Sequence, residues 1–441
     1  MSLVYKARLP VVRKLVALKL LSPHEHLIQL LGWQEVERRF ILEATSVASL
    51  RHPHVVELLD FDTAGGRPFF TMEYYYQNLG LIMGEEARSE TPCRVLGLDK
   101  IIHYGRQICL GLARLHRAGM VHRDIKPHNL LITDGDQLKL CDFGLSKLRG
   151  ETRGLSRGLL VGSPYYAAPE QERDPELVDV RADIYSLGVV LHRMLTGFLP
   201  GEGAPAPGQV HPDADASWDE FVFRALSPGK DDRFPSAMAM LVALEGLKDR
   251  WERKKRDFCV AFPTGKESLP RESSSSLPPR SQPLKVGPQD AQEIFGCDSL
   301  GRPRRHADHD YVVPPGDDLV MDQATGLIWQ RSGSPDPLEW REAGRYVASL
   351  NASGHGGLKR WRVPTVNELL SILDPFTFGE NDCIHAIFDR GKRWLWSSDR
   401  RSFASAWYAD TELGFTGWGD FTCRYHVRAV CDGIGGEFAP K

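Results

Sequence analysis

The chain has 441 residues, 42% of them hydrophobic and 26% charged, so it is too long for one ordinary domain and predicts two or three. A formal net charge of −3 argues against binding of nucleic acid through bulk charge. We find no apolar run of about 18–20 residues that could span a membrane, and no secretion signal. The eight cysteines lack the spacing of a disulfide framework, so we expect reduced thiols in a cytoplasmic protein.

Composition divides the chain into two predicted folded units and a tether. Residues 1–256 alternate strand-like and helix-like segments. Apolar residues at helical spacing in the stretch 181–199 predict a helix that is ended by Gly197 and Pro200. Residues 257–315 include a Ser/Pro/charged tract with few apolar anchors, and we expect a flexible linker there. Residues 316–433 regain a compact pattern and hold seven of the ten tryptophans.

Short motifs in the first unit carry the chemistry. They are VHRDIKPHNLLI at 121–132 and QLKLCDFGLSKL at 137–148, with VALK at 16–19 before them and APE at 168–170 after them. In this order they resemble the eukaryotic-type protein kinases over about the first 255 residues. The resemblance implies a two-lobed α+β fold and a bacterial Ser/Thr protein kinase that uses ATP and Mg²⁺ to phosphorylate proteins, itself included.

The resemblance assigns a role to each catalytic residue. Asp124 would orient the substrate hydroxyl and accept its proton, and Lys126 would neutralise the transferring phosphate. Asn129 and Asp142 would supply the oxygen ligands for Mg²⁺. These residue types suit phosphoryl transfer because its transition state spreads charge over oxygens, which makes positioning and electrostatics the main contributions to catalysis.

The resemblance also implies an ATP site. Lys19 would hold the α- and β-phosphates, and Glu43, in the helix-like run RRFILEATSVASL, would hold Lys19 by an ion pair. The adenine would lie on the backbone of TMEYYY, with Met72 as gatekeeper and Glu73 and Tyr75 as hinge contacts.

The glycine-rich phosphate loop of these kinases, G-x-G-x-x-G-x-V, is incomplete here. Val4 takes the valine position and Ser2 stands at or beside the third glycine. Two explanations stay open. Either the start codon is assigned too late and Met1 is an internal residue of the loop, or the enzyme has no lid. In the second case the chain would be a weakly active nucleotide-binding scaffold whose second unit binds a partner or glycan.

An activation segment is expected between the DFG and APE motifs. Because Arg123 precedes Asp124, the resemblance implies that phosphorylation orders this segment, with Thr152 and Ser156 as candidate acceptors. Ser163 is expected to position the substrate hydroxyl rather than to be phosphorylated.

Four further residues of the first unit are expected to be structural. Asp183 would brace the catalytic loop, Glu170 of the APE motif would pair with Arg233, and Cys141 would be a small buried side chain rather than a redox switch. The run Ser273–Ser276 is either an autophosphorylation target or a solvated linker, and we favour the linker.

The second unit resembles the C-terminal domain of bacterial collagen-like adhesins, the Lcl type, over about 317–432. The motifs TGLIWQ, WRVPTVNEL, WSS and YHVRAVCDG carry the resemblance. Thr365 and Glu368 form a capping-box pattern, which predicts a helix that starts after WRVP. The other segments read as short strands around aromatic cores, similar to the α+β fold of C-type lectins.

The partners of the second unit are left open by its sequence. Most of its tryptophans are expected in the core, although an exposed tryptophan can also stack on a sugar. We therefore keep a glycan or protein ligand, and dimerisation, as alternatives beside the protein substrates. An extracellular adhesin would fit this unit but conflicts with an ATP-dependent first unit.

Overall fold

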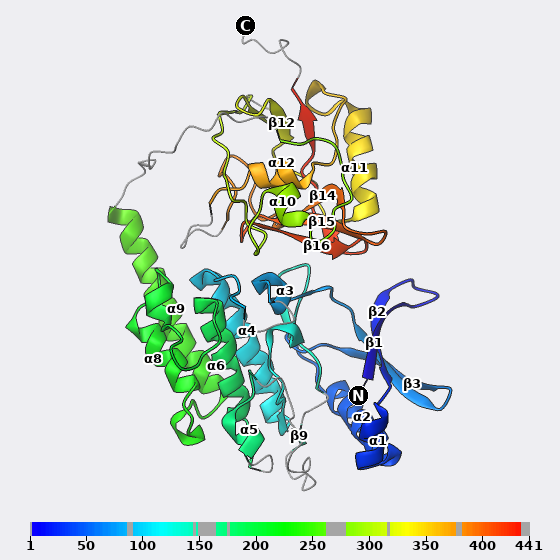
Figure 1. The fold of residues 1–441 in the computed structure, drawn as a ribbon, viewed down its shortest axis with the longest axis vertical. Coiled ribbons are helices and arrows are strands. Elements are labelled where there is room, and N and C mark those ends of the chain that lie inside the picture. Colours follow the sequence, from blue (N-terminus) through cyan, green and yellow to red (C-terminus); the bar gives the residue numbers. More distant parts are fainter. Residues whose placement is uncertain are drawn as a thin grey trace. The chain divides into compact units, whose positions relative to one another are not determined.

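The computed structural model describes residues 2–85, 91–143, 147–148, 165–173, 177–261, 279–314, 318–375 and 382–433. They belong to two compact units, Met1–Ala261 (the first unit) and Phe262–Lys441 (the second unit), drawn as ribbons in Figure 1. Every helix within these described ranges is too short or too polar to cross a membrane.

The first lobe of the first unit is a four-stranded antiparallel sheet in the order β1-β2-β4-β3. The strands are β1 (Ser2–Arg8), β2 (Leu15–Leu21), β3 (Leu58–Ala64) and β4 (Arg67–Glu73). Helices α1 (Glu25–Leu31) and α2 (Trp33–Ala48) pack beside the sheet, and α2 buries Phe40 and Ala44 against Leu21 and Phe70. Side chains alternate along a strand, so Lys19 shares the buried side of β2 with Leu21.

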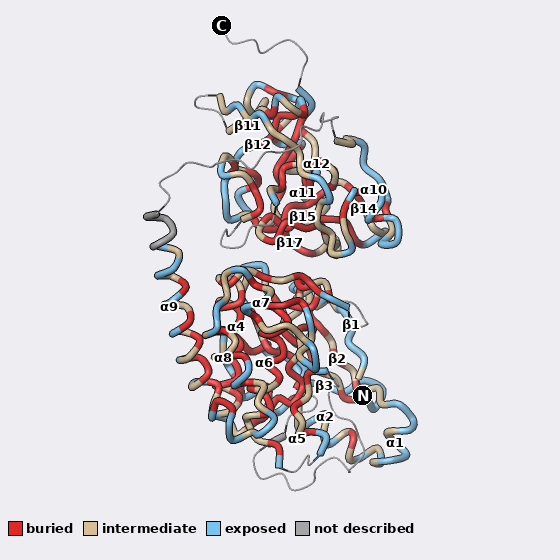
Figure 2. Tube along the Cα trace, turned by 60° about the vertical axis from the view of Figure 1, so that its left-hand side comes forward, coloured by how far each residue is buried: buried red, intermediate tan, exposed pale blue. Residues whose placement is uncertain are grey.

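The second lobe is mainly helical. Its central helix α6 (Arg181–Thr196) buries all but two of its 16 residues. Many residues along α4 (Leu98–Arg117) are buried as well (Figure 2). The predicted helix end at Gly197 is confirmed, because this glycine adopts a left-handed φ of 81°. The remaining elements are α3 (Leu79–Met83), β5 (Gln77–Asn78), β6 (Met120–Val121), η1 (Pro127–Asn129), β7 (Leu130–Ile132), β8 (Leu138–Leu140), β9 (Lys147–Leu148), α5 (Pro169–Arg173), α7 (Pro207–Val210), α8 (Ala216–Ala225), η2 (Lys230–Asp232) and α9 (Ala237–Ala261).

The second unit combines small antiparallel sheets with short helices. Its sheets have the orders β10-β11-β12-β18, β14-β15-β16 and β13-β17. The elements are α10 (Ala291–Phe295), β10 (Tyr311–Val312), β11 (Leu319–Asp322), β12 (Leu327–Gln330), β13 (Leu338–Glu339), α11 (Trp340–Ser353), η3 (His355–Gly357), α12 (Val366–Ser371), β14 (Trp394–Arg400), β15 (Ser405–Asp410), β16 (Phe415–Asp420), β17 (Arg424–Tyr425) and β18 (Val430–Asp432).

Two sequence predictions for the second unit are confirmed. Thr365 caps α12, because its side chain accepts a hydrogen bond from Glu368 N and the Glu368 carboxylate accepts one from Thr365 N. Most of the tryptophans lie in the core, since five of the seven are at most 5% exposed. The other two, Trp340 and Trp418, are partly buried.

Residues 279–314 pack as part of the second unit, so the flexible linker expected over 257–315 does not hold for this stretch. Val286 and Phe295 lie in one buried cluster with Trp407, and the Trp407 ring nitrogen donates to Val286 O at 3.1 Å. Arg280 binds the fully buried carboxylate of Asp399 through two nitrogens, at 2.7 and 3.0 Å. This stretch has few apolar side chains, but Val286 and Phe295 are buried in the core of the second unit.

Replacing Phe295 by alanine should destabilise the second unit by about 3–5 kcal/mol, because the side chain is 4% exposed and packs edge-on against Trp407. The measurement is urea unfolding of the full chain followed by tryptophan fluorescence, to which the second unit contributes most of the tryptophans. The matched control is Phe403→Ala, at a ring that is 87% exposed, which should cost less than about 1 kcal/mol. Equal effects of the two variants would contradict the packed arrangement.

His211, at the end of α7, is buried with both ring nitrogens in use. Nε2 donates to Leu96 O at 3.0 Å, and Nδ1 accepts from the Asp213 N–H at 3.2 Å. The neutral ring satisfies both contacts, whereas a protonated Nδ1 would face another N–H. Burial lowers the pKa of His211 to about 4, and the hydrogen bond to Leu96 opposes this only in part.

This burial predicts a pH dependence of stability. Because the folded pKa lies below the ordinary value of 6.5, the unfolded chain takes up the proton first, and stability falls as the pH drops below 6.5. The full effect at pH 4 corresponds to about 3 kcal/mol for the first unit. Unfolding by urea between pH 4 and 7, followed by circular dichroism, should show a shallower pH dependence for His211→Gln than for the unmodified chain. An unchanged slope would refute this linkage.

Candidate active site

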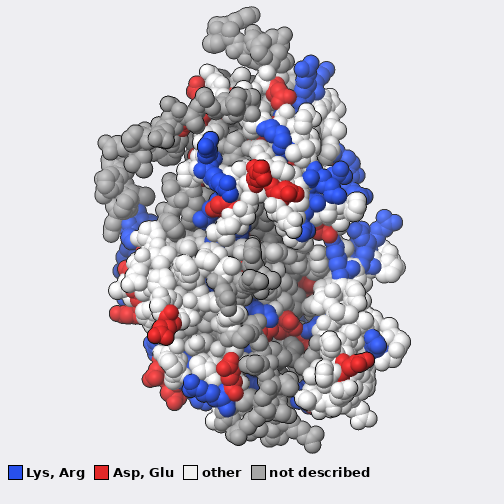
Figure 3. All heavy atoms as spheres, viewed as in Figure 1, with Lys and Arg blue, Asp and Glu red and all other residues white. Residues whose placement is uncertain are grey.

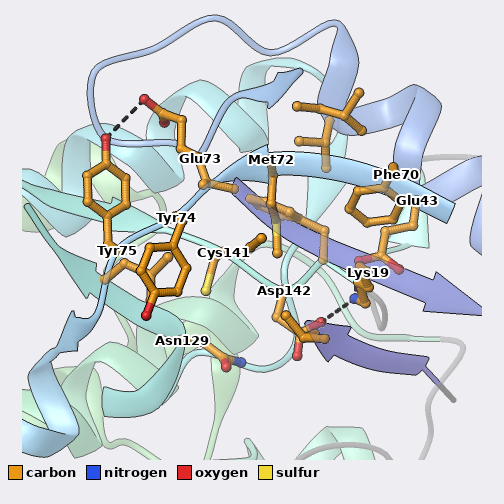
Figure 4. Close-up of a pocket in the computed structure, with 17 residues that line it drawn as sticks. Lys19, Glu43, Phe70, Met72, Glu73, Tyr74, Tyr75, Asn129, Cys141 and Asp142 are labelled. Carbon is orange, nitrogen blue, oxygen red and sulfur yellow. Dashed lines mark hydrogen bonds and ion pairs between the residues drawn. The ribbon is translucent and has the colours of Figure 1, made fainter. Parts of the chain in front are cut away.

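A cleft of the first unit gathers the predicted nucleotide and metal residues from elements far apart in the sequence (Figure 4). The sheet, α2, the catalytic loop and the segment after β8 all contribute to its lining. Eight predicted residues line it: Val4, Lys19, Glu43, Met72, Glu73, Tyr75, Asn129 and Asp142.

Lys19 joins the charged groups of this cleft. Its ammonium lies 2.7 Å from Glu43 Oε1 on α2 and 2.7 Å from Asp142 Oδ1 after β8. Burial lowers the pKa of Lys19, but the two carboxylates raise it by more, so the net shift is upward and the ammonium stays charged. Burial raises the pKa of Asp142 while Lys19 lowers it, with a net shift downward. The predicted Lys19–Glu43 ion pair is therefore present.

The three predicted catalytic residues meet at one carboxylate. Lys126 Nζ lies 2.8 Å from Asp124 Oδ2, and the Asn129 side-chain amide donates to the same oxygen at 2.9 Å and to Asp124 O at 2.8 Å. Asp124 is 8% exposed. Two donors thus hold Oδ2 of Asp124, and because the Asn129 amide nitrogen is engaged there, its amide oxygen is the atom that could bind a cation.

Asp183 holds the catalytic loop in position through hydrogen bonds to its backbone, as predicted. Its fully buried carboxylate accepts from the backbone N–H groups of His122 and Arg123 at 2.9 and 2.8 Å, and from the His116 ring at 2.8 Å. Burial raises the pKa of Asp183, but these donors lower it by more. Arg123 has a left-handed φ of 67°, a strained conformation that the hydrogen bonds to Asp183 hold in place.

The structure describes the two ends of the activation segment and the short strand Lys147–Leu148 within it. Arg233 binds Glu170 through two nitrogens at 2.6 and 2.8 Å, which confirms the predicted ion pair. At the other end, the Phe143 ring packs 5.1 Å from the His122 ring, beside Asp142. The candidate residues Thr152, Ser156 and Ser163 lie outside the described residues.

The hinge contains an ion pair that sequence reasoning missed. Glu73 accepts from Lys139 Nζ on β8 at 2.7 Å and from the Tyr75 hydroxyl at 3.0 Å, at the end of the pocket opposite Lys19 (Figure 4). Burial raises the pKa of Glu73, but these donors lower it by more. The Glu73 carboxylate is thus engaged within the protein, and the Glu73 backbone N–H donates to Glu57 O at 3.1 Å. No local sequence signal links Lys139 to the hinge, since the two residues are 66 positions apart.

Cys141 and several apolar residues complete the pocket. Cys141 is 8% exposed, and burial raises the pKa of its thiol, which fits the predicted structural role. Ala17 and Leu131 also line the pocket, although sequence reasoning did not select them, and Tyr74 lines it from the predicted stretch TMEYYY. On the face drawn in Figure 3, acidic and basic side chains are interspersed over the first unit, and both signs occur within its hollow.

Comparison with known proteins agrees with this geometry. The model of the protein kinase domain matches residues 1–231, just over half of the chain, and that of the Lcl C-terminal domain matches residues 318–431. The chain therefore belongs to the protein kinase family, with an Lcl C-terminal domain as its second unit.

Three bacterial serine/threonine-protein kinases are similar to this chain. A probable serine/threonine-protein kinase of Clostridium acetobutylicum is 30% identical over 272 residues, which cover 58% of this chain and 39% of the relative. Serine/threonine-protein kinase pkn3 of Myxococcus xanthus is 32% identical over 66% of this chain and 54% of its own length, and PknL of Mycobacterium tuberculosis is 32% identical over 65% and 69%. The chain thus spans 39% to 69% of the length of these three relatives.

Replacing Asp183 by asparagine should destabilise the first unit by about 3–5 kcal/mol, because it removes a fully buried negative charge that three donors surround. Chemical unfolding followed by circular dichroism measures the change. Asp231→Asn is the matched control, since that carboxylate also contacts an arginine but its side chain is 88% exposed. A loss below about 1 kcal/mol for Asp183→Asn would contradict the bracing role.

Proposed function

We propose that the chain transfers the γ-phosphoryl group of ATP to serine and threonine hydroxyls of proteins, including its own. One observation carries the proposal. Lys19 contacts Glu43 and Asp142 at once, and Asp124 holds Lys126 and Asn129, of which Asn129 lines the same cleft. These side chains together can hold a nucleotide and activate a hydroxyl.

The residues present fit a magnesium–nucleotide complex. The Asp142 side chain is 49% exposed although Lys19 contacts one of its oxygens, so it can bind a cation, and the Asn129 amide oxygen supplies a second hard ligand. No group of three His, Cys, Asp or Glu side chains in the described ranges could hold a metal, which fits an ion shared with phosphate oxygens. Bound Mg²⁺ supplies neutralisation of phosphate charge.

The transfer step assigns one role to each side chain of the catalytic loop. Asp124 takes the proton from the substrate hydroxyl as the new O–P bond forms and the bond from phosphorus to ADP breaks. Lys126, with its side chain 25% exposed, can stay paired with Asp124 while it neutralises the moving phosphoryl oxygens. Lys19 holds the remaining phosphates, and Glu43 keeps its ammonium in place.

The same geometry favours the active enzyme over a weakly active nucleotide-binding scaffold. A protein that only binds nucleotide does not need the proton acceptor Asp124. It also does not need the two proposed metal ligands, Asp142 and Asn129, together with the Lys19–Glu43 ion pair. The names of the bacterial relatives and Lys126 in HRDIKPHN favour serine and threonine as acceptors. The need for ATP places the reaction in the cytoplasm.

Recognition of a partner by the second unit is a separate part of the proposal. Trp340 stacks on Phe421 at 4.4 Å, and the Arg401 guanidinium lies 3.7 Å from the centre of the Trp418 ring. Because both tryptophans are partly exposed, they can offer ring faces to a protein or glycan ligand.

Replacing Asp124 by asparagine should lower autophosphorylation of the purified full chain with ATP and Mg²⁺ by at least about 100-fold, because the proton acceptor is lost. Transfer of labelled phosphate is the measurement. Asp134→Asn, at an exposed turn outside the cleft, is the matched control and should keep its activity. Equal labelling of Asp124→Asn and the unmodified chain would overturn the proposed function.

A further inference from the structure

The turn between β1 and β2 carries two valines that face solvent. Val11 is 93% exposed, more than any other large hydrophobic side chain of the described residues, and Val12 is 68% exposed. Two backbone hydrogen bonds close the turn, from Leu9 N to Lys14 O and from Arg13 N to Leu9 O, each at 2.9 Å. In Figure 1 this turn projects from the sheet of the first lobe. The valines therefore lie at the tip of a hydrogen-bonded hairpin.

Three exposed basic side chains flank this tip. Arg8 ends β1 before the turn, and Arg13 and Lys14 follow the two valines. Within the described ranges none of the three forms an ion pair with a carboxylate, and the sequence has no acidic residue before Glu25. Arg13 adopts a left-handed φ of 53°, at which a glycine would be less strained. The turn thus keeps a cation at a position that backbone conformation alone would give to glycine.

We propose that this hairpin tip, residues 8–14, docks the first unit on a membrane surface that contains anionic lipids. The side chains of Val11 and Val12 enter the boundary between headgroups and acyl chains, and the three cations meet the lipid phosphates. The inference concerns where the first unit binds. It goes beyond the proposed phosphoryl transfer and does not depend on it.

The composition of the hairpin tip favours a lipid surface over a protein or a nucleic acid. Binding to a protein groove is most often anchored by tryptophan, tyrosine or arginine, and valine is under-represented among such anchors. Single-stranded nucleic acid stacks its bases on aromatic rings, and residues 8–14 contain none. Exposed aliphatic side chains beside cations suit a surface that is anionic outside and apolar beneath.

The hairpin tip lies away from the nucleotide cleft. Val4 lines the cleft, and Arg8 stands four residues further along β1, which corresponds to about 13 Å in an extended strand. The turn continues beyond Arg8. A membrane that contacts Val11 and Val12 therefore leaves the cleft open to a nucleotide.

The test is co-sedimentation of the full chain with vesicles of two compositions. One is phosphatidylcholine alone, and the other is phosphatidylcholine and phosphatidylglycerol in equal parts, each at low and high salt. Three double variants change the hairpin tip. Val11→Ser with Val12→Ser removes the aliphatic side chains, Val11→Leu with Val12→Leu enlarges them, and Arg13→Gln with Lys14→Gln removes two cations.

The matched controls change residues of the same kinds on α9. Val242→Ser alters a valine that is 69% exposed. Arg250→Gln with Arg253→Gln removes two exposed cations from the basic run KDRWERKKRD. The second control also measures whether that run, rather than the hairpin tip, binds the vesicles. Circular dichroism of each variant verifies that it is folded.

The unmodified chain and both controls should bind the anionic vesicles at least about tenfold more tightly than the neutral ones, and high salt should reduce this preference. Loss of the two cations should weaken binding by about fivefold for each. The serine variant should bind about three- to tenfold more weakly, and the leucine variant more tightly by a similar factor. Unfolding does not produce such a gain, so the leucine variant separates docking from a structural role.

Equal binding to the two kinds of vesicle, or unchanged binding of the serine and glutamine variants of the hairpin tip, would overturn the inference. An equal loss in the α9 arginine variant would assign the binding to that helix instead. Self-association in sedimentation velocity that the serine variant abolishes, without vesicle binding, would assign the hairpin tip to contact with a second copy of the chain.

Discussion

The active site depends on a lysine that is buried and charged at the same time. An ammonium group taken out of water costs several kcal/mol unless opposite charges surround it, and Lys19 has two carboxylates at 2.7 Å. One comes from α2 and the other from the segment after β8. The sheet, the helix and the segment after β8 are therefore held together by one requirement, the neutralisation of this charge.

Two other buried carboxylates, Asp183 and Asp399, also hold segments of the chain in position. Asp183 holds two backbone N–H groups of the catalytic loop from α6, a helix that is buried almost all around. Asp399 in the second unit accepts from Arg280 and from the backbone N–H groups of Leu284 and Val366. In each case an irregular segment gains a defined position because a fully buried negative charge must be satisfied.

The sequence motifs anticipated the residues of the site because each motif is local. The HRD and DFG segments, the VALK strand and the capping box at Thr365 are each a few residues long, and their chemistry can be read without the fold. The Lys139–Glu73 pair could not be read in this way. Its two residues are 66 positions apart, and nothing in the neighbouring residues marks them.

The sequence by itself determined the family-like motifs, the candidate residues for phosphate transfer, the division into two units and the end of α6 at Gly197. Only the tertiary structure decided that 279–314 packs as part of the second unit and that the Glu73 carboxylate faces Lys139. The physical reason is the range of the interactions. Capping and backbone conformation act within a few residues, whereas burial and charge pairing depend on which distant segments the fold brings together.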